Sequence, residues 1–182
     1  MMQTDLSDLS ERAGALSERA DAAPGRARGP SRQTLLTFRL QGELFALPVE
    51  RVHEIIDPLP MTRVPRAPEL APGLINVRGS VVPVVDVRRR LEMPPATPGE
   101  ESRMVVLDVE IEQTLTKLAI VADGVDKVIE IEASEIEAVP EIGLRWPARF
   151  LAGVAQRAGD LIVLLRPETA FDPASARSAG AH

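Results

Sequence analysis

Few residues of this 182-residue chain could carry out chemistry, and their spacing matches no known catalytic arrangement. The two histidines are His53, within VERVHEII, and His182 at the last position. No serine, aspartate or cysteine pattern with the logic of a catalytic triad accompanies His53. Cysteine is absent, which excludes disulfides, thiolate metal ligands and cysteine nucleophiles. The sequence also lacks GxSxG, HExxH, GxGxxG and a glycine-rich loop ending in GK[ST], so we expect no catalytic residues.

Three carboxylates, those of Asp108, Glu110 and Glu112, occupy alternate positions, which would place them on one face of a strand. Such a row could bind a hard cation, but these sites usually collect their oxygen ligands from a curved loop. The alternative is a solvated sheet face that discourages aggregation through the strand edge. The second interpretation is favoured, and we expect neither a metal ion nor a cofactor.

The densest basic run is Arg88, Arg89 and Arg90. Three consecutive positions spread around a helix axis and form no single patch. A solvated helix end, where the macrodipole favours cations, explains the run.

Arg78 is harder to explain by folding alone. Together with Gly79 it separates two apolar runs, Leu74–Val77 and Val81–Val85, each of which is typical of a strand. Arg78 is therefore predicted at the tip of an apolar hairpin, where a core has no use for it. A docking surface could use it.

The surrounding pattern predicts about ten short strands with frequent turns, which is typical of β-barrels or sandwiches. Residues 104–112 alternate, so that Val105, Leu107 and Val109 are expected to face the core and Val106 the solvent. The linker-like segment PPATPGEES at 94–102 divides the strands into two groups. Apolar residues make up 45% of the chain, enough for a substantial core.

Composition excludes several classes of partner. Acids outnumber bases 27 to 21, giving a formal charge of −6, which disfavours binding to a phosphate backbone. Aromatics are 3%, with Trp146 the single tryptophan and no tyrosine, so a stacking platform for nucleic acid is not expected. The acidic start is unlike a secretory signal, and no apolar run approaches the roughly 18 residues of a membrane span. We expect a soluble, cytoplasmic protein.

Residues 1–33 differ from the rest and are expected to form a flexible tail, as are residues 172–182 at the other end. The pentapeptide LSERA occurs at 9–13 and again at 16–20, one heptad later. A helix that docks on a partner is one interpretation. A frayed tail is favoured, because a coiled coil normally needs three to four heptads and this stretch has about two.

Several linked motifs between residues 34 and 171 together resemble the chemotaxis coupling proteins, the CheW-like family. The motifs are Val52-His53-Glu54-Ile55, Thr62-Arg63-Val64-Pro65, Gly73-Leu74-Ile75-Asn76-Val77-Arg78-Gly79, Asp86 after an apolar strand, Ala122-Asp123-Gly124-Val125, and Phe150-Leu151-Ala152-Gly153-Val154. Ala119, Ala122 and Arg166 depart from the residues usual in the family.

The resemblance implies a mainly β fold of two SH3-like β-barrels that share a core, with short helices. The first barrel is expected mostly from residues 34–91 and the second mostly from residues 102–171, with exchange of strands allowed. It further implies a non-catalytic adaptor that couples the cytoplasmic tips of chemoreceptors (methyl-accepting chemotaxis proteins) to the regulatory domain of the histidine kinase CheA. Such a protein would be cytoplasmic and recruited to membrane-associated receptor arrays.

The resemblance also implies receptor contacts at Val52, Glu54, Gly73 and Arg78. Arginine offers five donors in a rigid fork, suited to carboxylates or helix-end carbonyls. Each position also has an ordinary structural explanation: a surface ion pair between Glu54 and Arg78, a turn at Gly73, and core packing at Val52.

A separate apolar contact with the kinase is expected around Val125 and Val128. Two alternatives remain. The same fold could serve a pilus-motility or other chemosensory-like pathway, or the chain could be a ligand- or metal-binding β-barrel that uses the Asp108 face.

Overall fold

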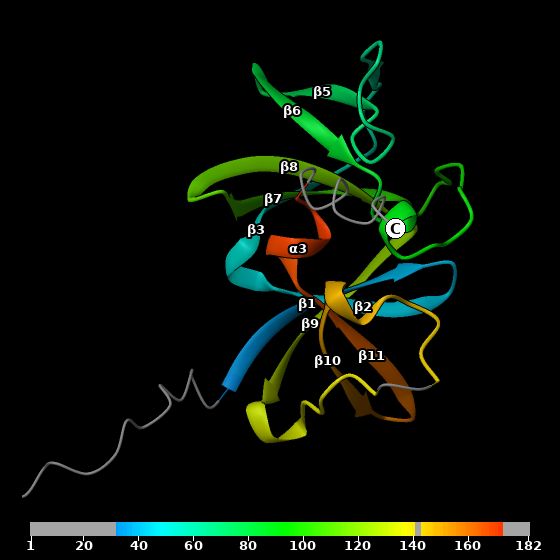
Figure 1. The fold of residues 1–182 in the computed structure, drawn as a ribbon, viewed down its shortest axis with the longest axis vertical. Helices are drawn as coiled ribbons and strands as arrows, with labels where there is room; N and C mark the ends of the chain where they lie inside the picture. Colours follow the sequence, from blue (N-terminus) through cyan, green and yellow to red (C-terminus); the bar gives the residue numbers. More distant parts are fainter. Residues whose placement is uncertain (1–31, 141–142, 173–182) are drawn as a thin grey trace, which may run out of the picture. The chain divides into compact units, whose positions relative to one another are not determined.

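The computed structural model describes residues 32–140 and 143–172, which form two β-sheets (Figure 1). Sheet 1 has the strand order β10 (Leu151–Arg157), β11 (Asp160–Leu165), β2 (Glu43–Pro48), β1 (Arg32–Leu40), β9 (Gly124–Glu132). Sheet 2 has the strand order β3 (Val52–Ile56), β7 (Arg103–Ile111), β8 (Thr114–Ala122), β6 (Ser80–Val85), β5 (Gly73–Val77), β4 (Thr62–Arg63).

Helices in the described part of the chain are short. The α-helices are α2 (Val87–Arg90) and α3 (Pro167–Ala170), and the 3₁₀ turns are η1 (Val49–Arg51), η2 (Ala133–Glu135) and η3 (Ala148–Phe150). None of the helices in residues 32–140 and 143–172 has the length and hydropathy needed to cross a membrane.

Four tight hairpins set the register of the sheets. Their two-residue loops are Gln41–Gly42, Arg78–Gly79, Glu112–Gln113 and Ala158–Gly159, and both residues of each loop have positive φ. This is the backbone of a type I′ turn, whose twist matches that of antiparallel strands. Glycine at the second position of three of these loops adopts positive φ without a steric cost.

Each sheet takes strands from both halves of the sequence. β1 and β2 pair with β9, β10 and β11, whereas β3 to β6 pair with β7 and β8. The chain crosses between the sheets after β2 and after β8, and each sheet contains one parallel pair, β2 with β11 and β6 with β8. Exchange of strands is thus much more extensive than a division into 34–91 and 102–171 would suggest.

The largest apolar cluster takes side chains from both sheets, including Phe38 and Phe45 of sheet 1 and Leu107 and Ile120 of sheet 2. The Trp146 ring meets the Phe45 ring edge to face, with centroids 5.2 Å apart. The predicted mainly β fold of two units around a shared core is confirmed.

Smaller clusters lie under each sheet separately, and one of them corrects a prediction. Val106, expected in solvent, is fully buried with Val82 and Val84 under sheet 2. The alternation in β7 was misleading because both faces of this strand are covered: Val105 and Leu107 face the shared core, and Val106 faces the sheet 2 cluster.

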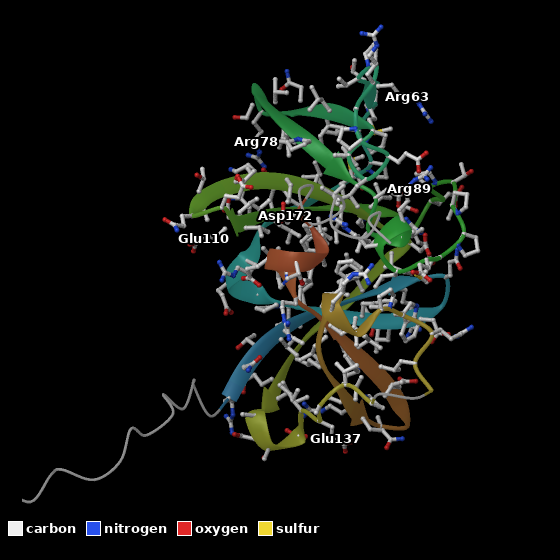
Figure 2. The ribbon with its side chains drawn as sticks, viewed as in Figure 1. Arg63, Arg78, Arg89, Glu110, Glu137 and Asp172 are labelled. Atoms are coloured by element: carbon white, nitrogen blue, oxygen red, sulfur yellow. The ribbon has the colours of Figure 1, made fainter. Side chains whose placement is uncertain are left out.

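The basic run at the end of sheet 2 also differs from the prediction of a solvated helix end. Arg89 is half exposed (Figure 2), but Arg88 and Arg90 are only 4% and 7% exposed. Arg90 donates to the Asp172 carbonyl and lies over the Phe150 ring, 5.2 Å from its centroid. Burial lowers the pKa of Arg90, and the charge of Asp172 offsets part of this effect.

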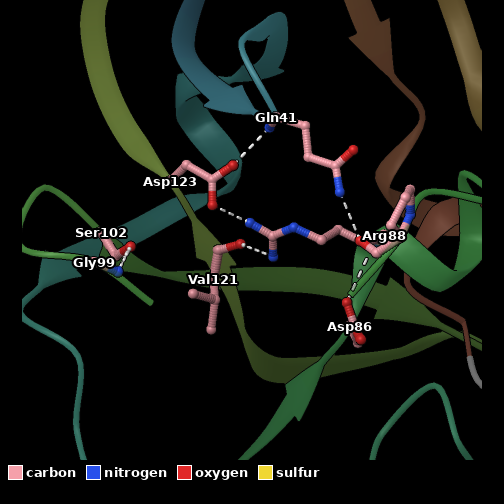
Figure 3. Close-up of polar contacts among 8 residues, drawn as sticks. Gln41, Asp86, Arg88, Gly99, Ser102, Val121 and Asp123 are labelled. Atoms are coloured by element: carbon pink, nitrogen blue, oxygen red, sulfur yellow. Dashed lines mark hydrogen bonds and ion pairs between the residues drawn. The ribbon is translucent and has the colours of Figure 1, made fainter. Parts of the chain in front are cut away.

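The buried Arg88 forms an ion pair with the partly exposed Asp123 (Figure 3). Its guanidinium donates to the Asp123 carboxylate and, at 3.1 Å, to the Val121 carbonyl. The same carboxylate accepts the Gln41 backbone N–H at 2.6 Å. Asp123 therefore joins α2 to the β1–β2 hairpin of the other sheet.

The predicted tails mostly lie outside the described residues, as does the LSERA repeat. At the boundary, Arg32 and Gln33 form the start of β1 and not a tail. The guanidinium of Arg32 pairs with Glu130 and Glu132 on β9, at 3.3 and 2.8 Å.

Replacing Asp123 with asparagine should destabilise the protein strongly. The substitution preserves shape but leaves the Arg88 charge buried without a counterion, so we expect a loss of about 2–4 kcal/mol in the free energy of unfolding. Urea denaturation measures this value. Asp126→Asn is the control, because its ion pair with Arg39 is exposed and 3.9 Å long, and should change stability by less than about 0.5 kcal/mol. Equal effects of the two substitutions would contradict the structural role of Asp123.

Candidate docking surfaces

Arg78 occupies the first position of the β5–β6 turn, with φ of 51°. The turn is closed by a side chain as well, since the Gly79 N–H donates to the Asn76 Oδ1 at 2.8 Å. Asparagine, aspartate and glycine are the usual residues at this position, because a longer side chain meets a conformational cost at positive φ. Formation of the hairpin therefore does not explain an arginine here.

The Arg78 side chain, labelled in Figure 2, projects from the β5–β6 turn. It is 82% exposed and is oriented by Glu54 on β3. Its Nε and Nη2 lie 3.2 and 3.0 Å from the Glu54 Oε2. Glu54 is only 17% exposed, so the carboxylate is the fixed member of the pair. The remaining guanidinium N–H donors point to no other group in the described chain and are available to a partner.

An open groove of about 570 Å³ lies beside this ion pair, between the ends of β3 and β5. Its apolar wall contains Ile55, Ile56, Leu59 and Val77, and Arg78 stands at its rim. β3 and β5 are not neighbours in sheet 2, so the sheet curves enough to bring the two strands together across this groove.

Val52 is not the exposed apolar residue of β3. It is half-buried and packs against the shared core, opposite Leu107. Ile55 is 42% exposed and lines the groove. A register shift between Val52 and Glu54 changes the alternation of the strand, which is why the sequence pattern did not single out Ile55.

Gly73 is buried, and the close approach expected there is made by this chain. A Cβ on Gly73 would lie 2.6 Å from Met61 Cγ and 2.7 Å from the Thr62 carbonyl oxygen. Gly73 is also at the opposite end of β5 from the Arg78 turn. The structure thus brings Glu54 and Arg78 together, whereas Val52 packs against the shared core and Gly73 lies apart.

His53 lies between an acid and a base on neighbouring strands. Its Nδ1 is 2.9 Å from Asp108 Oδ2 on β7, and its Nε2 is 2.9 Å from Lys117 Nζ on β8. An ammonium group only donates, so the Lys117 contact assigns Nε2 as acceptor and Nδ1–H as donor to Asp108.

The carboxylate row considered as a cation site is not assembled. Asp108 faces His53, Glu110 is exposed, and Glu112 lies in the β7–β8 turn with φ of 50°. Within the described residues, no group of three or more histidine, aspartate or glutamate side chains is placed to hold a metal ion.

The second predicted surface lies on β9, an edge strand of sheet 1. Val128 is 55% exposed, whereas Val125 is half-buried against the shared core. Between them the strand bulges, and the buried Thr37 hydroxyl donates to the Lys127 carbonyl at 2.7 Å. Of the two valines, only Val128 presents an apolar side chain to a partner.

Comparison with known proteins identifies the family. The CheW-like domain matches residues 34–174. The chain is 30% identical to the chemotaxis protein CheW of Rhizobium meliloti over 145 residues, 80% of this chain and 90% of that protein. It is 31% identical to the protein FrzA of Myxococcus xanthus over 129 residues, 70% of this chain and 77% of that protein.

A solved structure of a CheW protein also matches this chain. The scaffolding protein TtCheW of Thermoanaerobacter tengcongensis superposes with a TM-score of 0.69 at 27% identity, covering 81% of this chain and 92% of that one. The chain belongs to the CheW-like family. The resemblance predicted from the sequence is confirmed, and the predicted absence of enzymatic activity agrees with the description of the solved relative as a scaffolding protein.

Replacing Gly73 with alanine should destabilise the protein. The new Cβ would force the strand at Met61 and Thr62 to move, and we expect a loss of about 1–3 kcal/mol in the free energy of unfolding. Gly99→Ala is the matched control, because nothing lies within 4 Å of its Cβ position. Thermal and urea denaturation measure both variants. Unchanged stability in Gly73→Ala would show that the glycine is not required for packing.

Proposed function

We propose that this chain is a non-catalytic adaptor that couples the cytoplasmic tips of chemoreceptors to the histidine kinase CheA. One observation supports the receptor contact above all others. Arg78 is highly exposed in a turn that disfavours it, is oriented by a largely buried acid, and borders an open apolar groove. These features are typical of a residue retained for recognition and not for folding.

The groove suits a helical partner with polar groups at its end. Ile55 and Val77 provide apolar contacts for one face of a helix. The free donors of Arg78 suit a carboxylate or the carbonyls at a helix end. Glu54 holds the guanidinium in position, and Val52 and Gly73 support the two strands from within without touching the receptor.

The kinase is proposed to bind on the other sheet. Val128 on the open edge of β9 offers an exposed apolar side chain, and Val125 supports the strand from the core side. Exposed apolar residues commonly mark partner surfaces. Because the two surfaces belong to different sheets, receptor and kinase can bind at the same time, in a heterologous assembly.

Through its receptor contact the protein would be held at membrane-associated receptor arrays while remaining cytoplasmic. The alternative of another chemosensory-like or pilus-motility pathway is consistent with the match to FrzA, a relative that is not named as a chemotaxis protein. The same two surfaces would serve either pathway.

The receptor contact is tested by titrating a receptor-tip fragment into the full chain by calorimetry. Arg78→Ala should weaken binding about tenfold or more, because hydrogen bonds to a charged group contribute roughly 1.5–3 kcal/mol. Glu54→Ala should weaken it less, since Glu54 only orients Arg78. Arg145→Ala is the control, because Arg145 also forms an exposed pair with a glutamate, Glu43, but on the side of sheet 1. Absence of any receptor binding by the unaltered protein would refute the adaptor proposal.

The kinase contact is tested with a fragment of the CheA regulatory domain. Val128→Asp places a charge in the apolar contact and should weaken kinase binding about tenfold or more, while receptor binding is unchanged. Leu115→Asp alters an equally exposed aliphatic residue on sheet 2, 69% exposed against 55%, and should leave kinase binding intact. If Arg78→Ala weakened only kinase binding and Val128→Asp weakened only receptor binding, the assignment of the two surfaces would be reversed.

A further inference from the structure

A second cavity, separate from the Arg78 groove, opens on sheet 2 beside the segment 95–98. Its volume is about 420 Å³, within the usual range for small-molecule sites of about 300–1,000 Å³. Leu59, Met61, Val84 and Met104 form its apolar wall, and the exposed residues 95–98 form its outer rim. Methionine side chains adapt readily to ligands of different shape.

The charged groups around this cavity are mostly cationic. Arg63, Arg88 and Arg89 all line it, against one carboxylate, that of Asp86. Asp86 is already engaged, since it accepts the Arg88 backbone N–H at 3.3 Å and lies 3.7 Å from the Arg89 Nε. Arg89 is further paired with Glu69.

Two of the guanidinium groups keep donors without an acceptor. The Arg88 side chain is 5% exposed, and its Nε is buried with no hydrogen-bond partner in the described structure. A buried donor left unsatisfied is costly, so such groups usually indicate a missing partner. Arg63, on β4, is exposed and forms no ion pair with any described residue.

We propose that this cavity binds a small amphipathic carboxylate, with its apolar chain between Met61 and Met104 and its carboxylate beside Arg63. The carboxylate would pair with the exposed Arg63 guanidinium, and the Arg88 side chain adds positive charge to the cavity wall. The apolar wall would bury an unbranched chain. The site is distinct from the proposed adaptor surfaces, because neither Arg78 nor Val128 lines it, and it shares only Leu59 with the Arg78 groove.

The test uses the full chain and a series of hexanoate, octanoate and decanoate below their micelle concentrations. Calorimetry and amide NMR should show saturable binding, with shifts confined to residues around the cavity. Affinity should rise about three- to fourfold per added methylene until the cavity is full. The corresponding alcohols should bind several-fold more weakly, because they cannot pair with a guanidinium.

Three variants locate the site. Arg63→Gln should weaken binding of the carboxylates several-fold and leave binding of the alcohols unchanged. Ala96→Trp, at the exposed rim of the cavity, should prevent binding of both. Arg66→Gln is the control, an exposed arginine three residues from Arg63 that does not line the cavity. Non-saturable binding, equal affinity for carboxylates and alcohols, or unchanged binding in Ala96→Trp would overturn the proposal.

Discussion

The ion pair between the buried Arg88 and Asp123 links the two sheets of this protein beside their shared apolar core. Asp123 is the single residue between β8 of sheet 2 and β9 of sheet 1, so its backbone marks the point where the chain passes from one sheet to the other. Its carboxylate binds Arg88 and the Gln41 backbone, and its own N–H donates to the Arg39 carbonyl at 2.9 Å. One residue thus satisfies groups from both sheets, and it links the sheet that carries the proposed receptor surface to the sheet that carries the proposed kinase surface. A scaffold that bound two partners would need such a link, since it would keep the two surfaces in a fixed geometry.

The two sheets repeat the same arrangement of strands. In sheet 1 the hairpin β10–β11 lies next to the hairpin β2–β1 through the parallel pair β11 and β2, and β9 is the edge strand. Sheet 2 has the same order: the hairpin β5–β6, the parallel pair β6 and β8, the hairpin β8–β7, and the edge strand β3. The correspondence extends to single glycines. A Cβ on Gly153 would lie 2.6 Å from a side chain and 2.8 Å from a backbone oxygen of the preceding segment, nearly as Gly73 meets its own. Five residues after each glycine comes a type I′ turn, Arg78–Gly79 in one unit and Ala158–Gly159 in the other. Alanine at the equivalent position shows that the frame folds without an arginine, which supports a role for Arg78 in recognition.

Much of this architecture could be predicted from the sequence, because hairpins are encoded locally. A glycine after a polar residue between apolar runs is enough to predict the turn at Arg78. The failures involve groups whose surroundings come from distant residues. Burial of Arg88 depends on an acid 35 positions away, which composition and local pattern do not reveal. Val106 was predicted to face solvent because an alternating pattern implies that one face of the strand is exposed. In β7 both faces are covered. Ile55 was missed because a bulge reverses the faces of β3.

The duplication also relates the two surfaces proposed for the receptor and the kinase. VHEIID at 52–57 and VDKVIE at 125–130 occupy corresponding edge strands, β3 and β9, and each has one exposed aliphatic residue at the same place, Ile55 or Val128. The polar residue just before it differs in sign, glutamate in the first strand and lysine in the second. Glu54, however, is only 17% exposed and pairs with the exposed Arg78, whereas the turn position equivalent to Arg78 is Ala158 in the other unit. The two edges therefore share an exposed aliphatic residue but differ in the arginine beside it, and the two proposed surfaces would present different groups to a partner although they share one backbone plan.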